Sequence, residues 1–329
     1  MLILTAAEVR QALPMREAIE AMKRAYASLS DGKADAPLRT RLPIPPHNGL
    51  ALFMPAYVQA NETEALAVKI VSIHPENPKR GLPYIHAAVL VLEAETGRAV
   101  ALLEGGSLTA IRTGAGSGAA MDLLARKDSR VVAIFGAGVQ GRTQLEAACA
   151  VRNIQSAWVY DANRESAEKF VADMAGRGRV PRNLRAAESP AQAAEEADIV
   201  CTATTSTHPV FADADLKSGA HVSAIGSYTP EMQEVPAETV ARARVVVDSI
   251  SATLAETGDL VKPLQAGLIT ENHIYAELGE IVLGRKSGRQ SESEITYFNS
   301  VGIAVQDAMA AQLALKNAQK MGLGTNVDF

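Results

Sequence analysis

The chain has 329 residues, of which 47% are hydrophobic and 21% charged, a composition typical of a globular protein long enough to form two domains. Its formal net charge is -5 and its sequence holds no basic tract, which argues against nucleic acid as a partner. No stretch approaches the roughly 18 apolar residues that cross a bilayer, and residues 1–14 do not resemble a secretory leader, so we expect no membrane partner and a cytoplasmic location.

The first third of the chain mixes helix and strand patterns. Residues 15–32 place apolar side chains at helical spacing and end on a glycine suited to a helix C-cap. The apolar, β-branched run 66–73 predicts a strand, and residues 84–104 predict two strands joined at a turn. Residues 107–126 have a helical pattern rich in small side chains, which allows close packing. Together these features predict an α+β unit with antiparallel strands.

A glycine-rich turn follows that unit. Residues 131–135 are apolar and lead into Gly136, Gly138 and Gly141, which have the G-x-G-x-x-G spacing, and the residues after them have the composition of a helix. In such a turn the first glycine permits the tight bend, the second lets the backbone approach a pyrophosphate, and the third lets the helix pack on the strand. The helix N-terminus then faces the phosphates. The sequence therefore predicts a dinucleotide site here.

From this turn onward, strand and helix patterns alternate. We expect strands with helices between them over residues 131–135, 156–160, 198–203, 221–226 and 244–248. We expect residues 293–322 to form one long amphipathic helix that returns to the first unit. The predicted fold class is α/β: a Rossmann-type, doubly wound, mostly parallel sheet over residues 126–304, and a discontinuous α+β domain over residues 1–125 and 305–329.

The choice of cofactor depends on Asp161. This residue ends the predicted strand 156–160 and lies about twenty residues after Gly141, where an acid would accept hydrogen bonds from the ribose hydroxyls. Its carboxylate would repel the additional phosphate of NADP, although Arg164 could partly offset that repulsion. The expected cofactor is therefore NAD(H), with NADP(H) as the alternative.

Ligands of a doubly wound sheet bind beyond the carboxyl ends of its strands. Short polar side chains follow two of the predicted strands, at residues 202–205 and 226–230. We expect Thr202, with Ala203 and Thr204 beside it, to lie along the adenosine half of the dinucleotide. Gly226 would let the backbone approach the nicotinamide. At a third strand end, residues 248–249 are interpreted as ordinary loop chemistry.

Five basic side chains of the first unit are candidates for binding or catalysis: Arg39, Arg41, Lys69, His86 and Arg112. A planar guanidinium matches a carboxylate in a two-point fork, so the arginines are the expected holders of an amino or imino acid. Burial of a lysine in an apolar strand lowers its pKa, which suits Lys69 to proton transfer. The alternatives are that Lys69 points to solvent and that Arg39 and Arg41 are surface charges.

The remaining sequence signals concern metals and thiols. The sequence holds no cluster with metal-ligand spacing, so no metal is expected, and a dinucleotide site favours hydride transfer as the reaction class. Cys149 and Cys201 have no neighbour at metal or redox spacing and are interpreted as buried thiols of a reducing compartment.

Five segments of the chain, taken in order, resemble the ornithine cyclodeaminase and mu-crystallin family. They read VKIVSIHPENPKRGLP, ETGRAVALLEGGSLTAIRTGAGSGAA, FGAGVQGRTQLEA, AIGSYTPEMQEV and FNSVGIAVQDAMAA, and the similarity covers nearly the whole chain. The resemblance implies a homodimer. Its first unit would carry the subunit interface and the substrate pocket, and its Rossmann domain would bind NAD(H) or NADP(H).

The resemblance also implies roles for single residues. Arg39 matches the family's arginine for the substrate carboxylate, Lys69 its pocket lysine, and Arg112 its arginine near substrate and nicotinamide. Arg41 and Tyr228 are further candidates for substrate contact. Beyond the residues already named, the expected cofactor contacts are Arg112, Thr113, Ala137, Val139, Gln140, Ile225, Ser227, Ser300, Val301 and Gly302.

Two positions depart from the cyclodeaminases, since Leu52 and Tyr228 stand where those enzymes carry a glutamate and an aspartate. Deamination needs a base that deprotonates an amine or activates water. Reduction of an imine needs only a carboxylate clamp, a hydride and one proton, which Lys69 can donate. The favoured function is therefore that of an NAD(P)H-dependent oxidoreductase acting on the C=N bond of cyclic imino acids.

This function places the chain with the ketimine reductase branch of the family that it resembles. The expected reaction is the reduction of Δ1-pyrroline-2-carboxylate to L-proline, or of Δ1-piperideine-2-carboxylate to L-pipecolate. Three alternatives stay open. The first is an alanine dehydrogenase-like or other acyclic imino-acid reductase, for example of iminosuccinate. The others are an ornithine cyclodeaminase proper and an NAD(P)H-binding protein without turnover.

Overall fold

The computed structural model describes residues 1–60 and 63–328 of the chain. The chain divides into two compact units, Met1–Arg112 with Ile303–Phe329, and Thr113–Gly302. The first break lies inside helix α3 (Gly105–Leu124), at whose end the sequence places a boundary. Close packing explains the position of the break: a Cβ on Gly105 would lie 2.7 Å from Ala87 of the first unit, and one on Gly114 would lie 2.6 Å from Thr143 of the second.

An eight-stranded sheet forms the first unit, in the order β16-β1-β7-β6-β5-β4-β2, with β3 also paired to β4. Strand β1 runs parallel to β7, and the other pairs are antiparallel. The predicted strand and the predicted hairpin are both confirmed. The strand bounds are β1 Leu2–Leu4, β2 Ala34–Asp35, β3 Thr40–Ile44, β4 Gly49–Ala60, β5 Thr63–Ile73, β6 Ile85–Leu92, β7 Ala99–Glu104 and β16 Thr325–Asn326.

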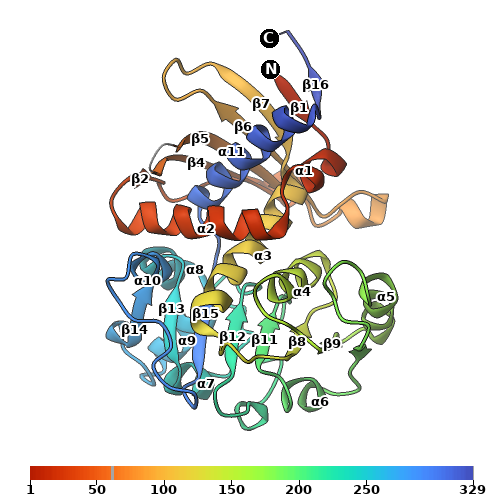
Figure 1. Ribbon diagram of the computed structural model, residues 1–329, viewed down its shortest axis with the longest axis vertical. Helices are drawn as coiled ribbons and strands as arrows, with labels where there is room; N and C mark the ends of the chain where they lie inside the picture. The colour runs from red at the N-terminus through yellow and green to blue at the C-terminus, as the bar shows by residue number, and fades with distance from the viewer. Residues whose placement is uncertain (61–62, 329) are drawn as a thin grey trace. The chain divides into compact units, whose positions relative to one another are not determined.

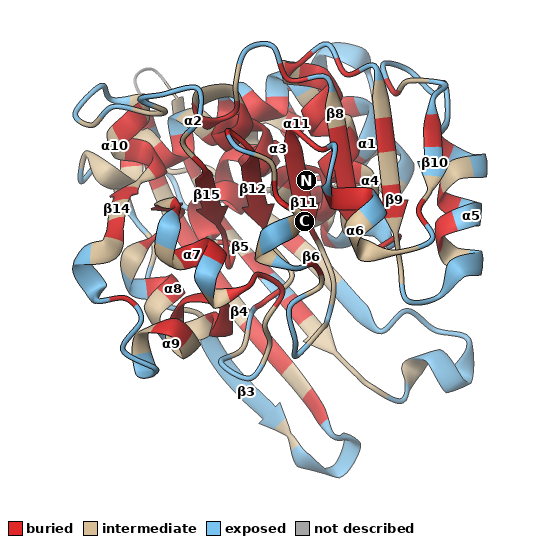
Figure 2. Ribbon diagram, turned by 90° about the horizontal axis from the view of Figure 1, so that it is seen from below, coloured by how far each residue is buried: buried red, intermediate tan, exposed pale blue. Residues whose placement is uncertain are grey.

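Three helices belong wholly to the first unit: α1 (Ala6–Ala12), α2 (Met15–Ser30) and α11 (Ala304–Met321). Helix α2 ends where the sequence predicts, before Gly32, whose φ is +69°. Helix α11 packs against α2, β4 and β5, as Figure 1 shows. Its alanines allow this close approach, and they are buried along most of its length. Strand β3, in contrast, is exposed (Figure 2).

The second unit is a wholly parallel sheet in the order β10-β9-β8-β11-β12-β15-β13-β14. The chain moves outward from β8 through β9 to β10 and then returns to the other side of β8 at β11. The switch point, where ligands bind in such sheets, therefore lies between β8 and β11. The strand bounds are β8 Val131–Phe135, β9 Ser156–Tyr160, β10 Leu184–Ala186, β11 Ile199–Thr202, β12 His221–Ala224, β13 Arg244–Val247, β14 Ile274–Glu277 and β15 Thr296–Asn299.

Both faces of this parallel sheet are buried. Along β8, Val132 and Ile134 join one apolar core, whereas Ala133 and Phe135 join the other. The central strands β11, β12 and β15 are buried at every residue (Figure 2). The helices of the second unit are α4 Val139–Val151, α5 Arg164–Met174, α6 Pro190–Ala194, α7 Ala237–Arg242, α8 Ile250–Glu256, α9 Gly258–Gln265 and α10 Leu278–Val282, beside the second part of α3.

The structure corrects the predicted form of the tail. Residues 293–322 do not form one helix, because Thr296–Asn299 is the buried strand β15 and the helix begins only at Ala304. The sequence of β15, Thr-Tyr-Phe-Asn, is β-branched and aromatic, and Gly302 adopts a φ of +78° that interrupts any helix before α11. The five predicted strands are confirmed to within about two residues, but β10, β14 and β15 were not predicted.

The described residues hold neither a membrane-spanning helix nor a cluster of metal ligands. Among residues 1–60 and 63–328, no helix is both long and apolar enough to cross a membrane. The same part of the chain holds no group of three or more His, Cys, Asp or Glu side chains that could bind a metal ion together. Cys149 and Cys201 are both buried and unbridged.

Candidate active site

The turn between β8 and α4 has the conformation that its glycines predict. Gly136 has a φ of +101°, and a Cβ there would lie 2.5 Å from the Ala203 carbonyl oxygen. A Cβ on Gly141 would lie 2.1 Å from the Gly136 carbonyl oxygen, so only glycine lets α4 begin this close to the turn. Gly138 caps the N-terminus of α4, and a Cβ on it would meet nothing within 4 Å. The backbone at Gly138 is therefore open to a phosphate group.

Asp161 lies immediately after β9 and is tied to this turn. Its Oδ2 accepts a hydrogen bond from the Ala137 N–H at 2.8 Å, and its Oδ1 accepts one from the Asn163 N–H at 2.9 Å. Arg164 pairs with Glu168 at 2.8 Å and reaches Glu188 at 4.0 Å. Arg164 is thus engaged by two other acids, which weakens the case that it binds the 2′-phosphate of NADP.

A cavity of about 460 Å³ opens at this edge of the second unit. Its walls come from the carboxyl ends of β8, β9 and β11, around the switch point. Phe135, Tyr160 and Val210 give it apolar surface suited to a planar ring. The lining residues are Phe135, Gly136, Gly138, Tyr160, Asp161, Ala162, Ala203, Thr204, Thr205, Ser206 and Val210. The predicted residues Gly136, Gly138, Asp161, Ala203 and Thr204 therefore share one cavity.

Thr202 has a different place. It is 0% exposed, and its hydroxyl donates a hydrogen bond to Glu234 Oε2 at 2.9 Å instead of lining the cavity. Glu234 is itself fully buried, and burial raises its pKa, although the hydrogen bonds from Thr204 and its other donors act in the opposite direction. Glu234 was not predicted as a site residue, because the short segment 231–235 has no periodic pattern that marks any of its residues as buried.

Asp248 organises the segment that follows β15. Its Oδ2 accepts hydrogen bonds from the Ser300 hydroxyl at 2.7 Å and from the Gly302 N–H at 2.8 Å. Asp248 is 1% exposed, so it is a buried acceptor that fixes residues 300–302, a structural role in keeping with the interpretation as loop chemistry. Val301 lies between its two donors.

The other residues proposed for the cofactor lie along the same strand ends, in the first turn of α4 or in helix α3. The Ile225 N–H donates to the Thr202 carbonyl, and the Ser227 hydroxyl donates to the Met232 carbonyl. Val139 is exposed in the first turn of α4, Gln140 follows it, and Thr113 is half-buried in α3. Tyr228 follows β12 and is 37% exposed.

Lys69 is the centre of a charged cluster in the first unit. It is 2% exposed and lies on the buried face of β5, so it does not point to solvent. Its Nζ lies 2.7 Å from Asp307 Oδ2, and Asp307 Oδ1 lies 3.0 Å from Arg112 Nε. Asp307 thus holds two cations together in the interior, where each would be costly without a counter-charge.

Neutral side chains complete the cluster. Arg112 Nη1 donates to Gln306 Oε1 at 2.8 Å, and Gln306 Nε2 donates to the Tyr26 hydroxyl oxygen at 2.7 Å. Four elements (α2, α3, β5 and α11) therefore meet at the cluster. The sequence analysis missed Tyr26, Gln306 and Asp307 as site residues. The available signal was the adjacent Gln306-Asp307 pair within an otherwise apolar stretch of α11.

The surroundings of Lys69 bring its pKa close to neutral pH. The pKa of Lys69 is lowered from 10.5 to about 7, chiefly by burial and then by the positive charges of Arg112 and Arg39. The carboxylate of Asp307 acts in the opposite direction. A group with this pKa can give or take a proton at physiological pH.

The candidate arginines of the first unit differ in position. Arg39 is half-buried just before β3, and its positive charge lowers the pKa of Lys69. Arg41 is exposed on β3 and pairs in register with Leu52 of β4, which is 7% exposed. His86 is exposed on β6, opposite Ser72. The structure therefore joins Lys69 and Arg112 through Asp307, with the charge of Arg39 acting on Lys69, and leaves Arg41 and His86 on the surface.

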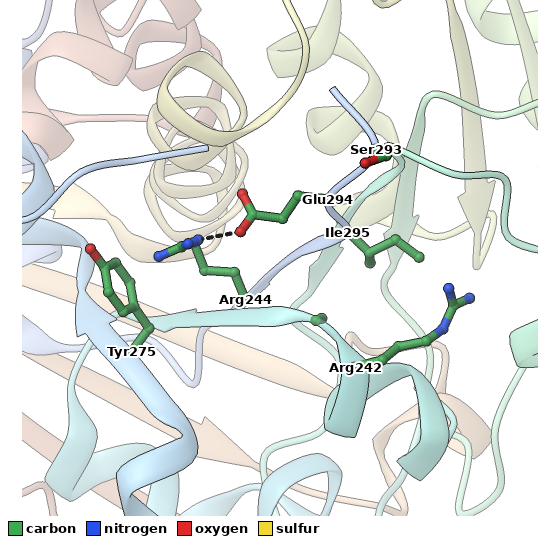
Figure 3. Close-up of a pocket in the computed structure, with 7 residues that line it drawn as sticks. Arg242, Arg244, Tyr275, Ser293, Glu294 and Ile295 are labelled. Atoms are coloured by element: carbon green, nitrogen blue, oxygen red, sulfur yellow. Dashed lines mark hydrogen bonds and ion pairs between the residues drawn. The ribbon is translucent and has the colours of Figure 1, made fainter. Parts of the chain in front are cut away.

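A second cavity of the second unit, also of about 460 Å³, lies at the amino ends of β13 and β15 (Figure 3). Arg244 there pairs with Glu294 at 2.7 Å and stacks 4.2 Å above the Tyr275 ring. Arg242 pairs with Asp213. Since both arginines are already engaged and the glycine-rich turn lies at the opposite ends of the strands, this cavity is not part of the candidate site.

Comparison with known proteins gives the same picture over the full length of the chain. The sequence model of the ornithine cyclodeaminase/mu-crystallin family matches residues 1–322. A Δ1-pyrroline-2-carboxylate reductase of Bacillus cereus is 40% identical over 330 residues, covering 100% of both chains.

Two solved structures have nearly the same fold. The Δ1-pyrroline-2-carboxylate reductase of Thermococcus litoralis, in complex with NADH and L-proline, has a TM-score of 0.93 and 45% identity, covering 99% of this chain and 100% of its own. An archaeal alanine dehydrogenase dimer with bound NAD has a TM-score of 0.91 and 33% identity, covering 100% of this chain and 99% of its own.

Proposed function

Because this chain belongs to the ornithine cyclodeaminase/mu-crystallin family, we propose that it is an NADH-dependent ketimine reductase that converts Δ1-pyrroline-2-carboxylate to L-proline. The observation that carries the proposal is the buried cluster of Lys69, Asp307 and Arg112, which sets a proton donor with a pKa of about 7 beside a cation. The activity named for the bacterial relative and the ligands of the archaeal structure support the choice of substrate.

The residues of the first unit have distinct tasks in this reaction. Arg39 and Arg112 bind the substrate carboxylate, because guanidinium groups match its two oxygens. Lys69, in its ammonium form, donates one proton to the imine nitrogen as the C=N bond becomes a C–N bond. Asp307 stabilises the positive charge of Lys69 in the interior and orients Arg112. Gln306, which itself donates to the Tyr26 hydroxyl oxygen, accepts a hydrogen bond from Arg112.

The second unit fits NADH. The open backbone at Gly138, the N-terminus of α4 and the Asp161 carboxylate are the groups that a pyrophosphate and a ribose require, and the cavity beside them has the size of a nucleoside pocket. NADH, when bound, supplies the hydride that reduces the imine carbon. Residues 136–141, Asp161, Ala203 and Thr204 would hold it, with Thr113, 225–227 and 300–302 completing the site.

Reduction is favoured over deamination by the two positions that differ from cyclodeaminases. Leu52 is a buried apolar residue of β4, and Tyr228 is a half-exposed phenol. Neither is a carboxylate that could activate water at neutral pH. The proposal therefore ranks alanine dehydrogenation and cyclodeamination below imine reduction.

The test of the proposed function is NADH oxidation by the purified protein with Δ1-pyrroline-2-carboxylate, Δ1-piperideine-2-carboxylate, pyruvate plus ammonia, and oxaloacetate plus ammonia. We expect rapid turnover with the cyclic imines, fastest with the five-membered ring. Turnover only with an oxo acid and ammonia would replace the proposal with an amino-acid dehydrogenase. NADH binding without any turnover would make the chain a binding protein.

Asp161 is expected to decide between NADH and NADPH. Asp161→Ser should weaken NADH binding about tenfold by removing a charged acceptor, and it should strengthen NADPH binding by removing a repulsive charge. Dissociation constants from fluorescence titration of both cofactors measure this. Asp173→Asn, which removes the same charge from the exposed end of α5, is the control. An unchanged ratio of the two dissociation constants would show that Asp161 does not select the cofactor.

We also propose that the protein is a homodimer of the first unit. That unit exposes several large apolar side chains, which contact with a second copy would remove from water. They are Leu38, Leu42, Leu82, Tyr84 and Ile85. Sedimentation equilibrium should give about twice the 34.7 kDa of one chain. Ile85→Glu should lower that mass, whereas Leu268→Glu at an exposed site of the second unit should not. A monomeric wild type would contradict the proposal.

A cytoplasmic location is part of the same proposal. Burial raises the pKa of Cys149 to about 12 and raises that of Cys201 as well, so neither thiol ionises readily. Two unbridged, unreactive thiols suit a reducing compartment.

A further inference from the structure

The buried side chain of Glu234 accepts four hydrogen bonds. Its Oε1 accepts from the Thr204 N–H at 2.5 Å and from the Thr204 hydroxyl at 2.7 Å. Its Oε2 accepts from the Gly226 N–H at 2.7 Å and from the Thr202 hydroxyl at 2.9 Å. One buried carboxylate thus collects four donors, which is the full acceptor capacity of an ionised carboxyl group.

These donors come from two neighbouring strands, whose ladder ends where the Ile225 N–H donates to the Thr202 carbonyl oxygen at 3.0 Å. Beyond that last ladder bond, Glu234 joins the two segments. Thr202 ends β11, Thr204 lies two residues beyond it, and Gly226 follows β12. The approach is close: a Cβ on Gly226 would lie 2.6 Å from Glu234 Oε1 and 2.2 Å from the Thr204 carbonyl oxygen. Glu234 therefore fixes the separation of the two chain segments at the edge of the sheet.

The same residue supports the wall of the cavity. Thr204 lines the cavity, and so does Val210, whose N–H donates to the Glu234 carbonyl oxygen at 2.9 Å. Both lining residues are therefore held by Glu234, one by the side chain and one by the backbone. Glu234 does not line the cavity itself.

A second buried acid holds Glu234 in place. Asp259 Oδ1 accepts from the N–H groups of Glu234 and Val235 at 2.7 and 3.0 Å. Asp259 is 0% exposed, and burial, together with the nearby charge of Glu234, raises the pKa of its carboxyl group to about 7. Because Glu234 receives four donors and Asp259 Oδ1 receives two, Glu234 is the acid of this pair that keeps its charge.

We propose that Glu234 is the positioning residue of the dinucleotide cavity, which it shapes by binding the ends of β11 and β12 to one carboxylate. This inference rests on the proposed function, since it takes NADH as the occupant of the cavity. It also gives Thr202 a new role: its hydroxyl supports Glu234 and does not contact the adenosine half of the cofactor.

The test compares Glu234→Gln with Asp198→Asn. Glutamine has the shape of glutamate, but its NH₂ group must face at least one of the four donors, so the strand ends must separate. Asp198 is a matched control, because it is a buried acid of the same unit that accepts two backbone N–H groups, of Arg130 and Val131, at the amino ends of β8 and β11. Both variants lose hydrogen bonds to a buried carboxylate, and Asp198 also pairs with Lys217 at 2.6 Å, but only the network of Glu234 includes residues that line the cavity.

The readouts are the dissociation constant of NADH by fluorescence titration and the melting temperature of the cofactor-free protein. We expect Glu234→Gln to weaken NADH binding about tenfold or more at a temperature where it is folded, and to retain most of kcat at saturating NADH. We expect Asp198→Asn to lower the melting temperature and to leave NADH binding within about twofold. Equal losses of NADH affinity in both variants would mean that Glu234 has only a structural role.

A second variant separates the role of Thr202. Thr202→Val removes one donor and keeps the shape of the side chain. If Thr202 acts through Glu234, the protein that carries both Thr202→Val and Glu234→Gln should bind NADH about as weakly as Glu234→Gln alone. If the two residues contact NADH independently, the fold-losses in NADH affinity of the two single variants should multiply. If Glu234→Gln binds NADH as the wild type does, the inference fails and the proposed function stands. If the wild type itself binds no NADH, the proposed function fails first.

Discussion

Lys69→Met is expected to reduce kcat/KM for imine reduction by about 10²–10⁴-fold, because it removes the proton donor while keeping the length and apolar character of the side chain. Steady-state NADH oxidation with Δ1-pyrroline-2-carboxylate measures the loss. The NADH dissociation constant should not change, since Lys69 belongs to the first unit and the cavity to the second.

The matched control is Lys316→Met, which removes an exposed lysine from α11, the helix that carries Asp307. It should leave kcat/KM within about twofold. If Lys69→Met retained more than a tenth of the wild-type activity, another group would have to be the proton donor.

The pH dependence of the wild type follows from the same residue. Reduction needs the protonated form of Lys69, whose pKa is about 7, so kcat/KM for reduction should be constant below that pH and fall tenfold per unit above it. Oxidation of L-proline needs the neutral amine, and its kcat/KM should rise through the same range. The pH profiles of kcat/KM in both directions test this, and a kcat/KM for reduction that stayed constant up to pH 9 would contradict it.

Asp307→Asn is expected to be the most destabilising of the site substitutions, at about 3–5 kcal/mol, because it leaves Lys69 and Arg112 buried without their shared counter-charge. Urea unfolding of the wild type and the variant measures the change in the free energy of unfolding. Asp35→Asn, at an exposed position of β2 in the same unit, is the control and should change stability by less than about 0.5 kcal/mol.

Asp307→Asn should also change the pH dependence of the reaction. Asp307 raises the pKa of Lys69 against the effects of burial and of the two arginines, so its removal should lower that pKa further. The fall in the reduction rate with rising pH should therefore begin at a lower pH than in the wild type. A variant with unchanged stability and an unchanged pH profile would show that Asp307 does not act on Lys69.

Local patterns were enough to predict the part of the fold that holds the cofactor. The strand 131–135, the glycines after it and Asp161 lie within about thirty residues, and each has a backbone or charge requirement that few residue types meet. Lys69 could be singled out for the same reason, since a lysine within an apolar, β-branched run is unusual. These features required no knowledge of distant contacts.

Distant contacts explain what was missed. Asp307 lies far from Lys69 and Arg112 in the sequence, and nothing in helix α11 indicates which cations it meets. Glu234 is recognisable only once β11 and β12 are neighbours. Strand β15 has four residues, and the polar Ser300 and the left-handed Gly302 after it are too brief an interruption to distinguish from a continuing helix. Burial of Thr202 likewise depends on the strands on both sides of β11.

The discontinuity of the first unit has a consequence for biosynthesis. A ribosome completes Tyr26, Lys69 and Arg112 early, but it reaches Asp307 only after the whole of the second unit, Thr113–Gly302, has been made. Until helix α11 emerges, the nascent chain must keep Lys69 hydrated, because its counter-charge does not yet exist. The second unit can thus fold first, and the final docking of α11 covers β4 and β5 and completes the charged cluster. A chain that stalls before residue 307 would display an apolar sheet face to chaperones and proteases, which gives the cell a means to recognise unfinished copies.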